Sequence, residues 1–107
     1  MIIVTTEHVS GQQETTSLGL VRGSSIRARH IGKDIMAGFR NIAGGEVHEY
    51  SKLLGESREE AVDRMQEEAE ALGADAVVGV RFQTSIVMQG AAEMLCYGTA
   101  VKLETAL

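Results

Sequence analysis

The side chains best able to hold a soft metal ion are one cysteine and three histidines, namely Cys96, His8, His30 and His48. Copper(I), zinc and cadmium prefer thiolate sulfur and imidazole nitrogen. A mononuclear site usually takes three or four such ligands, yet the chain has no CxxC, no HxxxH and no second cysteine. Glu46 and His48 are two residues apart, a poor spacing for one helix face. The candidate metal ligands are therefore Cys96, His48 and His30, with Cu or Zn as the cofactor, and no complete set is evident.

Cys96 allows two interpretations. It lies in a strand-like stretch among small residues, where a free cysteine commonly serves as a small buried hydrophobic side chain. In a ring of identical subunits, one Cys96 per subunit around the axis would instead bring several thiolates together. The two interpretations differ in how far Cys96 lies from other copies.

The sequence contains few features that indicate a catalytic site. A nucleophile at Cys96 or at Ser24–Ser25 would need a base and an orienting acid, and the sequence contains no GxSxG motif. The stretch Gly19–Ser25 fits neither GxxxxGK[ST] nor GxGxxG. Its glycines are better explained by a bent strand.

The net charge of −5 and the pI near 5.1 argue against nonspecific binding to nucleic acid, which needs a basic surface. Residues 56–70 carry that whole net charge, whereas residues 22–33 form a basic stretch. Two solvated faces explain this pattern. Acidic-to-basic matching between subunits is the alternative.

The chain reads as one domain over residues 1–107. A domain of this size has modest stability, and a single cysteine cannot form an internal disulfide, so self-association is one route to stability. One thiol fits a reducing compartment. The sequence shows no signal peptide and no apolar run of membrane-spanning length. We therefore expect a cytoplasmic protein with no membrane partner.

Residues 2–6 and 14–29 have strand character, the second with a bend at a glycine. Apolar residues at helical spacing predict a helix over 31–43 that stops at Gly44–Gly45.

A second helical stretch should be interrupted or kinked at Gly55 and be followed by a capping box, Ser57 to Glu60. Its apolar stripe is Ala61, Val62, Met65, Ala69 and Leu72, with Glu60 and Arg64 paired four residues apart and Gly73 as the stop.

The sequence pattern in the last third of the chain predicts a long antiparallel hairpin. From residue 74 the sequence is apolar and then alternates, with Val78, Val80, Phe82 and Ile86 on one side. A turn at Gln89–Gly90–Ala91 leads to a strand over 93–103. One face of that strand is small, comprising Met94, Cys96, Gly98 and Ala100. Strands of this length leave edges and faces that a lone subunit can hardly cover, which favours self-association.

A family resemblance covers nearly the whole chain. The residues that carry it are Gly19-Leu20-Val21-Arg22-Gly23, Gly44-Gly45-Glu46, Tyr50, Arg58, Ala61, Arg64-Met65, Ala69, Gly73-Ala74-Asp75-Ala76-Val77-Val78-Gly79 and Tyr97-Gly98-Thr99-Ala100-Val101. Together they resemble the YbjQ family, whose domain is described as heavy-metal-binding and whose biochemical role is undefined. The resemblance implies a dodecin-like α+β subunit and a ring-shaped homo-oligomer, a pentamer.

The expected fold is therefore α+β and β-rich, with N-terminal strands, two to three helices and a long C-terminal hairpin, assembled as a ring. The expected function is a homo-oligomeric binding or scaffolding protein that takes a heavy metal. A module that binds small molecules in pockets between subunits is the alternative.

Overall fold

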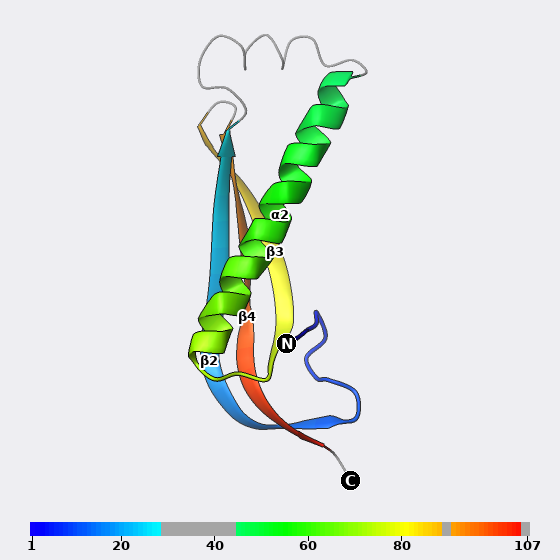
Figure 1. Cartoon of the computed structure of the whole chain (residues 1–107), viewed down its shortest axis with the longest axis vertical. Coiled ribbons are helices and arrows are strands. Elements are labelled where there is room, and N and C mark those ends of the chain that lie inside the picture. Colours follow the sequence, from blue (N-terminus) through cyan, green and yellow to red (C-terminus); the bar gives the residue numbers. More distant parts are fainter. Residues whose placement is uncertain (29–44, 89–90, 106–107) are drawn as a thin grey trace.

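The computed structural model describes residues 1–28, 45–88 and 91–105, and in these ranges it holds one helix and one four-stranded sheet. The strands are β1 (Ile2–Ile3), β2 (Gln12–Ala28), β3 (Ala76–Met88) and β4 (Ala91–Thr105), in the spatial order β1-β3-β4-β2. The helix, α2 (Gly45–Ala71), runs diagonally across β2 and β4 (Figure 1). The predicted α+β class is confirmed.

The long C-terminal hairpin is also confirmed. β3 and β4 pair antiparallel from Ala76 opposite Val101 to Met88 opposite Ala91. β2 pairs antiparallel with the other side of β4, so β2 and β3 run parallel with β4 between them. β1 is short and pairs parallel with the start of β3. β2 is one strand with register shifts near Ser17, and Gly19 at φ +107° supplies the predicted bend.

The predicted break in the helix at Gly55 is wrong, because α2 is continuous from Gly45 to Ala71. The capping box is wrong for the same reason. Ser57 lies in the middle of α2, is 1% exposed and faces the sheet layer. Helix propensity disfavours an internal glycine by only about 1 kcal/mol, and tertiary packing outweighs this cost.

The helix stop at Gly73 is confirmed. Gly73 has φ +77°, and its N–H donates to the carbonyl of Glu70 while the N–H of Ala74 donates to that of Ala69. This pair of bonds is a Schellman motif, which satisfies the last carbonyls of a helix.

The alternation predicted for β3 fails at Gly79. Gly79 has φ +62°, and the register with β4 shifts between Val78 and Arg81. This β-bulge reverses the faces, so Val78 and Val80 belong to different apolar clusters although the sequence placed them together.

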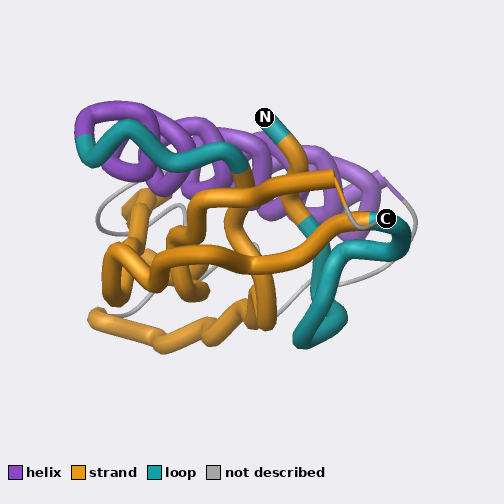
Figure 2. The backbone as a smooth tube through the Cα atoms, turned by 90° about the horizontal axis from the view of Figure 1, so that it is seen from below, coloured by secondary structure: helices purple, strands orange, loops and turns teal. Residues whose placement is uncertain are grey.

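One face of the sheet packs against α2 (Figure 2). The predicted small face of β4 lies there, because Met94, Cys96, Gly98 and Ala100 are all buried. The predicted stripe of α2 supplies the other side, with Ala61, Met65 and Ala69 fully buried. Leu72 is the exception, at 47% exposed.

The closest approach in this layer is at Gly23 of β2. A methyl group placed there would lie 2.2 Å from the carbonyl oxygen of Ala61 and 2.3 Å from the backbone nitrogen of Met65. Both are main-chain atoms, so neither can move aside as a side chain would. A glycine on β2 and small residues on α2 therefore bring the two backbones into contact.

The other face of the sheet is only partly covered. The N-terminal segment lays Val4 and Val9 against Ala76, Val78 and Val101 at one end. On the same face, Leu20 and Ile26 of β2 are each 62% exposed.

Several predictions lie outside the described residues. They are the helix over 31–43, its stop at Gly44, and Gln89–Gly90 of the last turn. The number of helices therefore stays open beyond α2. No helix in the described ranges combines the length and the apolar character needed to cross a membrane.

Substitution of Gly23 by Ala is expected to lower the free energy of unfolding by roughly 3 kcal/mol, because overpacking against rigid backbone forces α2 off the sheet. Gly55→Ala is the matched control. The nearest atom to a methyl there is Arg58 Nη2 at 3.7 Å, so it should stabilise by about 0.5–1 kcal/mol. Urea unfolding at equal protein concentration measures both. Equal effects of the two variants would contradict the packing described at Gly23.

Candidate functional site

Two sulfur atoms meet in the middle of the helix–sheet layer. The thiol of Cys96 on β4 donates to Sδ of Met65 on α2 over 3.5 Å, and both residues are fully buried. Met94, two residues before Cys96 on the same face of β4, accepts the hydroxyl of Thr84 at its Sδ over 3.4 Å. Three sulfur-bearing side chains are thus gathered under α2.

Burial raises the pKa of the Cys96 thiol above its ordinary value, because an apolar environment disfavours the thiolate. The thiol is therefore protonated at neutral pH. This state suits a packing role and makes Cys96 a poor nucleophile.

Of the three predicted metal ligands, Cys96 is the one whose side chain the structure describes, so the set stays a prediction. His48 is in the first turns of α2, 17 residues before Met65, which puts it about 25 Å along the helix from the Cys96 contact. His30 lies outside the described residues. His8 is elsewhere, 81% exposed and 3.2 Å from the carboxylate of Glu14. Among the residues whose side chains the structure describes, 1–27, 51–86 and 91–105, no three His, Cys, Asp or Glu side chains form a metal-binding group.

Met65 is the partner that the sequence did not single out. The helical stripe predicted that Met65 is buried, and the alternation of β4 predicted the same for Cys96. Their contact depends on how α2 crosses the sheet, which neither pattern encodes.

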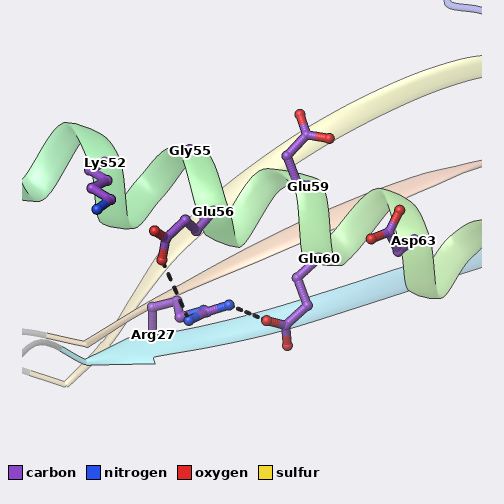
Figure 3. A pocket seen from close by; sticks show the side chains of 7 residues that line it. All are labelled: Arg27, Lys52, Gly55, Glu56, Glu59, Glu60 and Asp63. Carbon is purple, nitrogen blue, oxygen red and sulfur yellow. Dashed lines mark hydrogen bonds and ion pairs between the residues drawn. The ribbon is translucent and has the colours of Figure 1, made fainter.

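A second cluster is ionic and lies where α2 crosses the end of β2. An open cleft there, of about 620 Å³, is lined by Arg27, Lys52, Gly55, Glu56, Glu59, Glu60 and Asp63. Figure 3 shows the Arg27 guanidinium reaching from β2 toward Glu56 and Glu60 on α2. It contacts the Glu60 carboxylate directly and lies 3.9 Å from that of Glu56. The acidic and basic stretches thus meet at Arg27 within a single chain.

Glu60 also holds Arg64, which confirms the predicted pair four residues apart. Arg64 in turn donates through Nη1 to the backbone carbonyl of Ser24. Since β2 is an edge strand, this bond covers one outward carbonyl of the sheet. Glu60 therefore links two arginines that fasten α2 to β2, instead of capping a helix.

Comparison with known proteins agrees with this architecture. The sequence matches the YbjQ family, described as "Putative heavy-metal-binding", over residues 1–104. A UPF0145 protein of Methanosarcina acetivorans is 61% identical over 103 residues, which cover 96% of this chain and 97% of that protein. A UPF0145 protein of Clostridioides difficile is 59% identical over 97% of this chain and 93% of its own length.

A crystal structure of a protein of unknown function from Pediococcus pentosaceus, described as a member of the DUF74 family, has the same fold. Its TM-score is 0.64 at 18% sequence identity, with 97% of this chain and 98% of that chain covered. The chain described here belongs to the YbjQ family.

The heavy-metal description can be tested against the donor atoms present. A zinc site would want four nitrogen, oxygen or thiolate ligands, and no such set gathers in the described ranges. The contact between Cys96 and Met65 offers one thiol and one thioether instead. These donors suit a soft ion such as Cu(I).

Glu60→Gln is expected to lower the free energy of unfolding by about 1 kcal/mol, since it weakens bonds to two arginines. The side chains of Glu60 and Arg27 are 31% and 33% exposed, so the effect should shrink in 1 M salt. Glu59→Gln is the control, because it removes the same charge from an exposed residue of the same turn. Chemical unfolding at low and high salt provides the measurement, and equal losses for the two variants would contradict a specific role for Glu60.

Proposed function

We propose that this chain is the building block of a ring-shaped homo-oligomer, a pentamer, that serves as a binding or scaffolding protein. The main observation behind this proposal is the face of the sheet opposite α2, which is only partly covered. Leu20 and Ile26 stand on it at 62% exposure, beside half-buried Leu95 and Tyr97 of β4. Arg22 and Ser24 lie between them on the same face of β2, so this face carries exposed apolar side chains among polar ones, as protein interfaces do.

The edges of the sheet support the same proposal. β2 is an edge strand of 17 residues, against a usual strand length of about 5–6. On the opposite side, backbone bonds from the N-terminal segment reach β3 only as far as Val80. Within the described part of the chain, no strand pairs with the outer edge of β3 beyond that point. Other copies could cover such edges, which otherwise invite uncontrolled association.

The shape of the subunit is a third argument. Its Cα radius of gyration is 17.4 Å and its extents are 58 × 23 × 15 Å. A compact domain of this length would have a radius of gyration of about 13 Å. An elongated subunit has a high ratio of surface to volume, and contacts with neighbouring copies lower the exposed apolar area.

Binding of a heavy metal is the second candidate function. The family description suggests it, and the buried sulfur pair of Cys96 and Met65 is the observation that favours a soft ion. A role for thiolates from several subunits depends on how the copies are arranged, so it stays a prediction.

The double substitution Leu20→Glu with Ile26→Glu should break the assembly into 11.5 kDa subunits, because it buries two carboxylates in the proposed interface. Leu72→Glu is the control, since Leu72 is also exposed, at 47%, but lies at the end of α2 away from this face. Sedimentation velocity measures the mass of each variant, and circular dichroism verifies the fold.

If both variants keep the same mass as the parent chain, the uncovered face is not the interface. Dissociation of the Leu72 variant alone would place the interface at the end of α2 instead.

A further inference from the structure

The layer under α2 contains three sulfur-bearing side chains and a buried serine. Met65 and Cys96 are fully buried, Met94 is 5% exposed and Ser25 is 1% exposed. Among the described residues, the Ser25 hydroxyl has no hydrogen-bond partner. A buried hydroxyl without a partner costs about 1–3 kcal/mol, which an alanine at this position would avoid.

The strand register places these side chains together. Gly23 is opposite Cys96 and Ser25 is opposite Met94, so Ser25, Met94 and Cys96 are neighbours on the helix-facing side of two paired strands. Met65 comes from α2 above them and contacts the Cys96 sulfur. Two sulfur ligands from different elements, a third sulfur beside them and an unpaired hydroxyl therefore share one part of the layer.

The spacing of the sulfurs suits a shared ion. Two sulfurs that each lie ~2.3 Å from one metal ion are roughly 3.8–4.0 Å apart at tetrahedral or trigonal angles. The observed separation of Cys96 Sγ and Met65 Sδ is 3.5 Å. A widening of a few tenths of an ångström would bring this separation into that range, and the unbranched methionine side chain can supply the movement.

We propose that Cys96 and Met65 form a site for a single Cu(I) ion, with Met94 as the third sulfur ligand. Thiolate together with thioether is the ligand set that selects Cu(I) over zinc and harder ions. When the ion binds, the Cys96 thiol releases its proton to solvent and the sulfur bonds to the metal, with no change of oxidation state. This site rests on the heavy-metal function put forward above and gives it particular residues.

The proton competes with the ion for Cys96. Because the Cys96 thiol must give up one proton when its sulfur bonds to the ion, Cu(I) affinity should rise roughly tenfold for each pH unit across the neutral range. A site built from histidine or methionine alone would show a flatter dependence there.

The test is anaerobic titration of the full chain with Cu(I) in competition with a chromophoric Cu(I) chelator, between pH 6 and 8. The parent chain should bind one Cu(I) per subunit. Cys96→Ser should abolish binding, and Met65→Leu, which conserves volume, should weaken it at least tenfold. X-ray absorption of the loaded protein should show sulfur neighbours only.

Ser57→Ala is the control for a substitution in the same buried layer away from the sulfurs. Ser57 is 1% exposed and lies eight residues, or about 12 Å, from Met65 along α2. It should leave Cu(I) binding unchanged. Circular dichroism and the sedimentation mass of each variant establish that fold and assembly are intact.

The proposal is overturned if the parent chain takes up no Cu(I) at pH 8, or if Cys96→Ser and Met65→Leu bind it as the parent does. Nitrogen neighbours in the absorption spectrum would assign the ion to histidines instead. Assembly is measured on the same samples. Absence of Cu(I) binding would therefore not contradict the oligomer proposal, and a monomeric mass would not contradict the Cu(I) site.

Discussion

The contact between the backbones of α2 and β2 at Gly23 is the constraint on which the rest of the structure depends. There is no room for even a methyl group between Gly23 and the main chain at Ala61 and Met65. The small residues that line this contact let the helix lie low over the sheet. This depth brings the Met65 sulfur down to Cys96 and the Glu60 carboxylate within reach of Arg27.

The same contact decides what remains uncovered. A helix that lies diagonally over β2 and β4 shields that part of one face and makes little contact with β3 (Figure 1). On the same face, Phe82 and Ile86 of β3 are therefore exposed. The N-terminal segment covers one end of the opposite face. The remainder of that face, the outer edge of β2 and the edge of β3 beyond Val80 have no strand paired with them in the described part of the chain. The tight internal packing and the proposed self-association are therefore two results of one arrangement.

The sequence predicted burial and helix ends correctly where these features depend on one helix or strand alone. Alternation along β4 identified its small buried face, helical spacing identified Met65 as buried, and Gly73 marked the end of α2. It failed where tertiary contacts outweigh local preference. Gly55 and Ser57 look like a helix boundary, but the packing of α2 on β2 carries the helix through both. At Gly79 one extra residue in β3 reverses the alternation, and a bulge of this kind leaves only a weak sequence signal.

The candidate site was predictable only in part, for the same physical reason. Cys96 stands out in the sequence because it is the only cysteine. Its neighbours Met65 and Ser25 come from segments 31 and 71 residues away. Their meeting is set by the crossing of α2 over the sheet and by the register of β2 against β4, which no local pattern specifies. The histidines were predicted as metal ligands from their residue type alone. In the structure, the backbone of His48 lies far along the helix from the sulfur pair.

The central claim is that this subunit completes its surface with other copies of itself. Light scattering coupled to size exclusion, on the unmodified chain over a range of dilutions, tests it most directly. The account predicts a single species whose mass is a fixed multiple of 11.5 kDa, five for the proposed ring. A monodisperse 11.5 kDa species at every concentration would contradict it.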